Sequence, residues 1–151
     1  MRAAPLLLLL SAAASATRVQ AGDAFGSWQQ SQLRSTAPYP TSFIVRFEPH
    51  ARGEVFTLER TDARERITTS STILYLDGRP REFHGFGCSG TQSSRRVDSL
   101  TVEILQTCAG GQWTRFVRRI PAGSRELFLD VTEQMPDGRR FERRLVFEKR
   151  L

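Results

Sequence analysis

The chain of 151 residues contains no asparagine, two cysteines and a single lysine among its 22 lysine and arginine residues. Without asparagine there is no acceptor for N-glycosylation. Two cysteines are too few for a disulfide-dense miniprotein or a four-cysteine zinc site. The sequence also has no apolar run long enough for a stable membrane span. The excess of arginine over lysine is a compositional bias and indicates no function by itself.

Familiar catalytic signatures are absent as well. The sequence has no G-x-S-x-G, H-E-x-x-H or P-loop motif. Of the two histidines, His50 falls in an expected turn, and His84 lies four residues before Cys88. His84 and Cys88 could suggest a metal site or a Cys–His nucleophile, but this spacing does not converge on an extended chain. We therefore expect a protein that is not an enzyme and that uses no metal or cofactor.

The overall composition is that of a globular protein, with 39% hydrophobic and 25% charged residues. The first 21 residues have the features of a secretory signal peptide: Arg2 near the start, leucines at 6–10 and small residues before Ala21. We expect cleavage after Ala21, with Ala16 as the alternative. The prediction is a secreted or periplasmic protein with a signal peptide at 1–21 and a single domain at 22–151.

Period-2 alternation of apolar and polar residues recurs along the mature chain and predicts consecutive β-strands. These begin at Gly26-Ser27-Trp28 and continue at 41–48, 54–61, 67–76, 91–97, 100–107, 112–120, 125–134 and 140–148. The dipeptides Asp77-Gly78 and Asp137-Gly138 predict type I′ hairpin turns, in which both central residues take positive φ. No window beyond the signal peptide shows a sustained helical period, so the pattern predicts an all-β fold, and nearly every connection between the strands is short. We expect an antiparallel up-and-down barrel of about 8–10 strands rather than a Greek key.

The two cysteines are expected to pair, because a secreted protein folds in an oxidising compartment. If the strands on either side of Asp98-Ser99 form a hairpin, Cys88 and Cys108 face each other at its open end, to within a one-residue bulge. Such a disulfide closes a loop of about 20 residues and stabilises the fold by roughly 3 kcal/mol. The alternative is two unrelated buried thiols.

Several short motifs follow one another in a recognisable order. They are Gly26-Ser27-Trp28, Phe47-Glu48-Pro49, Leu76-Asp77-Gly78-Arg79-Pro80, Met135-Pro136-Asp137-Gly138 and the final Val146-Phe147-Glu148-Lys149. In this order, over about residues 25–149, the chain resembles a family of small secreted bacterial proteins of unassigned activity with a lipocalin-like, calycin-type β-barrel. The cysteine pair is not part of that pattern, and Pro121-Ala122-Gly123-Ser124 stands where the family has a D-G turn.

The resemblance also implies a structural role for Trp28. In the wider lipocalin-like superfamily, the tryptophan of the G-x-W motif closes one end of the barrel beneath a basic side chain from the last strand. Here that side chain would be Arg143, Arg144 or Lys149. Burial of the ring, with a cation above its face, would form an amphipathic plug at the barrel end.

A ligand cavity is the main functional hypothesis, because a barrel of about eight strands is wide enough to hold one small ligand. Arg118 and Arg143 share the strand parity of apolar neighbours, and an inward arginine would suit a carboxylate or phosphate head group. The alternatives are a barrel filled by its own side chains and arginines that are paired at the rim or used in the plug. The apolar residues expected to face inward are Phe43, Val45, Phe47, Phe56, Leu58, Tyr75, Leu129, Leu145 and Phe147.

The competing hypothesis is an arginine-rich exterior that binds a polyanion or a protein partner. Adjacent arginines on the last strands could form a basic surface, but each pair divides between the two faces of its strand. Secretion argues against a nucleic-acid partner. We therefore expect a non-catalytic secreted binding module for a small apolar or amphipathic ligand, with an envelope-associated interaction protein as the alternative. The arginine pairs are Arg118-Arg119, Arg139-Arg140 and Arg143-Arg144.

Overall fold

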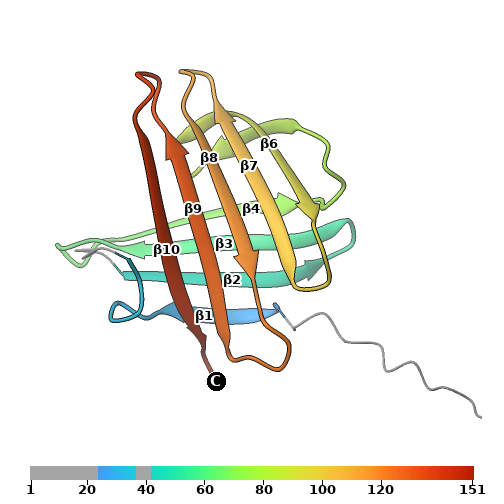
Figure 1. Ribbon diagram of the computed structural model, residues 1–151, viewed down its shortest axis with the longest axis vertical. Helices are drawn as coiled ribbons and strands as arrows, with labels where there is room; N and C mark the ends of the chain where they lie inside the picture. Colours follow the sequence, from blue (N-terminus) through green and yellow to red (C-terminus); the bar gives the residue numbers. More distant parts are fainter. Residues whose placement is uncertain (1–23, 37–41) are drawn as a thin grey trace, which may run out of the picture.

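The structure is a computed structural model that describes residues 24–36 and 42–151 (Figure 1). Within these residues the chain forms ten β-strands and no helix. The first five are β1 (Gly26–Gln30), β2 (Ser42–His50), β3 (Gly53–Thr61), β4 (Ile67–Leu74) and β5 (Arg81–Gly85). The others are β6 (Cys88–Arg96), β7 (Thr101–Cys108), β8 (Trp113–Arg119), β9 (Glu126–Gln134) and β10 (Arg140–Lys149).

All ten strands belong to one antiparallel sheet with the order β4-β3-β2-β1-β10-β9-β8-β7-β6-β5. β1 pairs with both β10 and β2, so Trp28 lies opposite Lys149 on one side and Val45 on the other. In Figure 1 the strands β1–β4 cross those of β7–β10 at a steep angle, because the sheet curls back on itself. The end strands β4 and β5 are not paired with each other. The predicted up-and-down antiparallel barrel is confirmed as a nearly closed barrel of ten strands.

Alternation of side chains along each strand decides which residues fill the barrel. On β9, Leu127, Leu129 and Val131 are buried and the residues between them are only half-buried. Trp28, Phe47 and Phe147 are at most 1% exposed and belong to one hydrophobic core. They lie toward the end of the barrel that holds the β2–β3 and β8–β9 connections, which we call the closed end. The opposite end, with the β3–β4, β5–β6 and β9–β10 connections, is called the mouth.

β5 is a strand that the sequence pattern does not reveal. Its five residues, Arg-Glu-Phe-His-Gly, contain one large apolar side chain, Phe83, and so show no alternation to detect. Phe83 is 5% exposed. The strand is held by its pairing with β6, where Phe83 lies opposite Gly90.

Neither Asp-Gly dipeptide forms the predicted type I′ turn, because Gly78 and Gly138 have positive φ but the aspartates before them do not. Asp77-Gly78 lies in the connection between the two end strands, where Gly78 N donates to Ser94 O at 2.7 Å. Asp137-Gly138 does turn the β9–β10 hairpin, but as part of a longer loop in which Gly138 N donates to Met135 O at 2.9 Å.

The signal peptide predicted at 1–21 lies outside the described residues. Within the described ranges, no helix is long and apolar enough to cross a membrane.

Candidate functional site

A cavity of about 640 Å³ lies inside the barrel on its mouth side. Its size falls within the range of about 300–1,000 Å³ that is usual for small-molecule sites. The closed-end core lies beneath it, so the barrel is packed at one end and hollow at the other. The apolar lining comes from both halves of the sheet and comprises Phe43, Phe56, Leu58, Phe86, Phe116, Leu129, Val131, Leu145 and Phe147.

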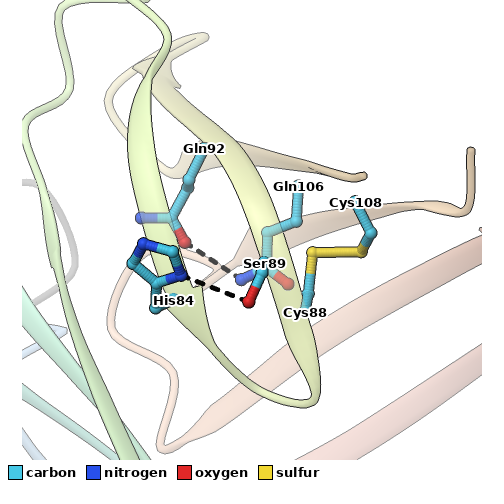
Figure 2. The surroundings of a disulfide bond; sticks show 6 residues. All are labelled: His84, Cys88, Ser89, Gln92, Gln106 and Cys108. Carbon is cyan, nitrogen blue, oxygen red and sulfur yellow. Dashed lines mark hydrogen bonds between the residues drawn. A yellow bond between two sulfur atoms is a disulfide. The ribbon is translucent and has the colours of Figure 1, made fainter. Parts of the chain in front are cut away.

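One part of the cavity wall is polar. Ser70 of β4 and Gln106 of β7 line it, and Gln92 of β6 joins these strands with its carboxamide. Gln106 Nε2 donates to Gln92 Oε1 at 2.9 Å (Figure 2), and Gln92 Nε2 donates to Thr72 Oγ1 at 2.9 Å. These side chains bridge the line between β4 and the β5–β6 hairpin, where the backbone ladder is interrupted. We call this line the seam.

Phe86 closes the seam on the mouth side. It forms the two-residue turn between β5 and β6 with Gly87, and their φ values of 54° and 72° give the type I′ conformation. The Phe86 ring stacks on Phe56 at 5.3 Å between centroids and lies 6.0 Å from Phe83. A bulky residue at positive φ is strained. Here the strained backbone places an aromatic ring on the cavity wall.

Figure 2 shows the disulfide between Cys88 and Cys108. Both cysteines line the cavity at the mouth. The predicted pairing is present, with a Cα–Cα distance of 5.3 Å. The predicted register was off, because Gly90 and not Cys88 lies opposite Cys108, so the bridge runs diagonally. Gly90 allows the backbones of β6 and β7 to lie close together beside the disulfide, since a Cβ there would lie 1.9 Å from Thr107 O.

Arg118 and Glu54 form a buried ion pair on the closed-end side of the cavity. Arg118 Nη1 lies 2.5 Å from Glu54 Oε2, and the side chains are 3% and 5% exposed. Arg96 adds a longer contact of 3.4 Å to Glu54, and the Arg118 guanidinium lies 4.3 Å from the centre of the Phe47 ring. Arg118 therefore faces the interior as its parity predicts, but its charge is balanced by a carboxylate of the protein.

Arg143 lines the cavity and is also paired. Its Nη2 lies 2.5 Å from Glu133 Oε2, and the two side chains are 33% and 26% exposed. Glu133 lines the cavity beside it. The wall therefore carries a partly solvated ion pair rather than an isolated cation.

The barrel-end plug is present, and its cation is Lys149. Trp28 is fully buried, its Nε1 donates to Ala24 O at 2.9 Å, and Lys149 Nζ lies 5.3 Å from its ring centre. The arginines named as plug candidates are engaged elsewhere, Arg143 with Glu133 and Arg144 with Asp130. Lys149 takes this place because it lies directly opposite Trp28 in the β1–β10 register.

Seven of the residues predicted to face a ligand line the cavity: Phe43, Phe56, Leu58, Leu129, Arg143, Leu145 and Phe147. Val45 and Phe47 face inward but are buried in the closed-end core. Tyr75 requires a correction. It follows β4, whose even-numbered residues face the interior, and its ring lies against the Arg81 guanidinium at 3.9 Å, outside the described cavity lining.

Sequence reasoning missed several lining residues. Phe86 lies between two glycines, in a segment without alternation that reads as a loop. Ser70 and Gln106 have the inward parity of their strands, but a search for apolar inward residues passes over them. Arg60 was also missed, although it shares the parity of Phe56 and Leu58 and the same argument had named Arg118 and Arg143.

The histidine and cysteine singled out by the sequence, His84 and Cys88, are engaged with other partners in the described part of the chain. Cys88 is committed to the disulfide, and His84 bonds to exposed partners, with Nε2 2.9 Å from Glu82 Oε1 and Nδ1 3.2 Å from Ser89 Oγ (Figure 2). Among the described residues, no three His, Cys, Asp or Glu side chains are grouped as a metal site requires.

Exterior arginines are extensively paired with acidic side chains. Arg95 and Arg115 share Glu103, and hydrogen bonds from these two arginines hold the pKa of Glu103 below its ordinary value, against the effect of burial. Arg144 pairs with Asp130 at 2.6 Å. These contacts reduce the positive charge that the barrel offers to a polyanion.

No protein-family model and no curated protein matches the chain. Among solved structures, the chain is similar to a Schistosoma mansoni fatty acid binding protein in complex with arachidonic acid. The TM-score is 0.59 at 10% identity, and the match covers 87% of this chain and 99% of the other. The chain folds as a calycin-type β-barrel. At this identity the likeness concerns the fold alone. A shared barrel fold does not determine which ligand is bound, because the ligand depends on the residues that line the cavity.

Proposed function

We propose that this protein is a non-catalytic binding module that holds a small, partly apolar ligand in its barrel cavity. The observation that carries the proposal is the cavity of about 640 Å³, with nine large apolar side chains in its lining and a polar wall along the seam. Apolar enclosure supplies affinity, and a few polar groups orient a ligand. The solved neighbour is in complex with arachidonic acid, so a barrel of similar fold can hold a lipid.

The proposal includes secretion. A signal peptide at 1–21 would deliver the domain at 22–151 to the periplasm or the exterior, in keeping with the family of secreted bacterial proteins that the chain resembles. The Cys88–Cys108 disulfide supports an oxidising location. Mass spectrometry of the protein exported from a bacterial host tests this directly. The expected mass corresponds to cleavage after Ala21 with the disulfide intact, and an uncleaved or reduced chain would contradict it.

The binding proposal is tested by filling the cavity. Ser70 lines it, whereas its neighbour Thr69 is exposed, so Ser70→Trp and Thr69→Trp form a matched pair on β4. Native mass spectrometry and displacement of the neutral dye Nile red by dodecanol would measure binding. We expect binding to wild type and Thr69→Trp and a large loss for Ser70→Trp. Equal binding by the two variants, or no binding by wild type, would overturn the proposal.

A further inference from the structure

The arrangement of arginines around the cavity indicates which way round a charged ligand lies, an inference that rests on the proposed function. Three arginines have inward parity near the cavity: Arg118, Arg143 and Arg60. A carboxylate or phosphate group binds where a guanidinium is available to it. The question is therefore which of the three lacks a carboxylate of the protein.

Arg118 cannot serve this purpose without breaking a buried pair. Its guanidinium bonds to Glu54 through two contacts of 2.5 and 3.2 Å, with both side chains almost fully buried. An anionic head group placed there would also meet the Glu54 carboxylate in a poorly solvated space, where like charges repel strongly. The closed-end side of the cavity is therefore unfavourable for an anion.

Arg143 is balanced in the same way by Glu133, 2.5 Å away in the cavity wall. An incoming anion would compete with that carboxylate for the same guanidinium. The pair is partly exposed, so the repulsion is weaker than at Glu54, but the site has no net charge to offer.

Arg60 differs from both. It lines the cavity at the mouth, opposite Phe43 on β2 and Thr68 on β4, and its side chain forms no ion pair or hydrogen bond with another described residue. The acidic residue two positions away, Asp62, is committed to Arg66, with Arg66 Nη2 at 2.7 Å. Hydrogen bonds from Arg66 lower the pKa of Asp62 and the charge of Arg60 adds to this effect, but no carboxylate of the described residues is bonded to Arg60. Arg60 therefore brings to the lining at the mouth a guanidinium that is not engaged in an ion pair.

We propose that the ligand is a single-chain amphiphile with an anionic head group, bound with its head on Arg60 at the mouth and its chain directed toward the closed end. The head group stays hydrated at the rim, next to the Thr68 hydroxyl. The chain contacts the apolar lining formed by Leu58, Leu129 and Phe147. Arg60 sets the charge preference, and the apolar lining sets most of the affinity.

Paired ligands and paired variants separate the head-group site from binding as such. Displacement of Nile red would compare dodecanoate and monododecyl phosphate with neutral dodecanol, on wild type, Arg60→Gln and Arg143→Gln. We expect Arg60→Gln to weaken binding of the anions about fivefold, because a charge contact at the partly exposed rim is screened by solvent. Dodecanol binding should not change. Arg60→Glu should reverse the preference and favour dodecyltrimethylammonium.

The outcomes are distinct. If wild type binds neither dodecanol nor the anions, the proposed function fails and this inference fails with it. If both kinds of ligand bind but Arg60→Gln leaves the anions unaffected, only the inference is overturned. Loss of anion binding in Arg143→Gln alone would place the head group on the β10 wall instead. A response to one anion but not the other would identify the head group as carboxylate or phosphate.

Orientation has its own readout, because the chain has two tryptophans and Trp28 lies in the closed-end core. In a Trp113→Phe variant, Trp28 is the one tryptophan left, and its emission can be excited selectively over that of the two tyrosines. Dodecanoate brominated at its terminal carbon should quench Trp28 more than dodecanoate brominated beside the carboxylate. The reverse order would show the head group directed inward and would overturn the proposed orientation.

Discussion

The ring of Phe86 stacks on the ring of Phe56 across the seam, at 5.3 Å between centroids. The two residues belong to opposite sides of the interruption between β4 and β5, and the stack continues from Phe56 to Phe47 at 5.1 Å. An aromatic row therefore runs from the closed-end core to the mouth. It spans the part of the wall that lacks a backbone ladder.

This contact makes an unusual prediction for substitutions at Phe86. Phe86→Ala and Phe86→Gly both remove the ring, but only glycine accepts φ of 54° without strain. We expect both variants to be less stable than wild type, and Phe86→Ala to be less stable than Phe86→Gly by about 1 kcal/mol. Urea denaturation would measure the difference. An alanine variant as stable as the glycine variant would show that the turn does not keep its left-handed conformation.

Gly90 is a second position at which adding a single Cβ atom is expected to change the stability of the fold. A Cβ at Gly90 would lie 1.9 Å from Thr107 O, whereas a Cβ at Gly110 would have no heavy atom within 4 Å. Gly90→Ala should lower the free energy of unfolding by about 3 kcal/mol, because β6 must move away from β7. Gly110→Ala, the control, should be nearly neutral. Thermal melting of both variants with the disulfide intact would check this, and similar losses in both would contradict it.

Substituting Glu54 and substituting Arg118 are expected to lower the free energy of unfolding by different amounts, although the two residues form one buried ion pair. Glu54→Met leaves Arg118 buried without a carboxylate and should cost about 3–5 kcal/mol. Arg118→Met should cost less, because Glu54 keeps its 3.4 Å contact with Arg96. The double variant should recover much of the loss, since no buried charge is left alone. A double-mutant cycle in urea measures the coupling, and strict additivity would show that the pair does not act as a unit.

Acid sensitivity follows from Glu103. The arginines beside it lower its pKa in the folded protein below the ordinary value of 4.5, so the ionised carboxylate stabilises the fold. This contribution is present in full above about pH 4.5 and is lost as the pH falls through the lower folded pKa. Glu103→Gln should therefore reduce stability at neutral pH but flatten its decline below pH 4.5. An unchanged pH profile in the variant would contradict this assignment.

The sequence predicts the barrel well because most of its strands show a clear alternation of apolar and polar residues. Alternation on β9 and β10 places Leu129 and Leu145 inward correctly, and these residues line the cavity. Strand parity is a local property, and a regular sheet preserves it over long distances. At Tyr75 the wrong parity was chosen, because the apolar run Ile73-Leu74-Tyr75-Leu76 does not show by itself that the even-numbered residues of β4 face inward.

The parts that could not be predicted depend on partners distant in sequence. Parity places Arg118 and Arg143 inward but says nothing of Glu54 and Glu133, which neutralise them. A left-handed Phe86 is likewise unexpected from sequence, because turn preferences point to the Asp-Gly dipeptides. Packing of the Phe86 ring against Phe56 offsets the strain of the left-handed backbone at Phe86, and only the folded barrel brings the two rings together.

The seam also determines how the wall can yield. On the closed-end side, Gly78 N donates to Ser94 O at 2.7 Å, so a main-chain bond pins the β4–β5 connection to β6. Toward the mouth, the same two walls are joined by the Gln92 carboxamide and the Phe86 ring. Water can replace the hydrogen-bond partners of the Gln92 carboxamide, and the Phe86 ring can shift over the face of Phe56. If β4 moved away from β6, the bond between Gly78 and Ser94 would act as the pivot and the barrel would widen at the mouth, while every paired strand kept its backbone ladder.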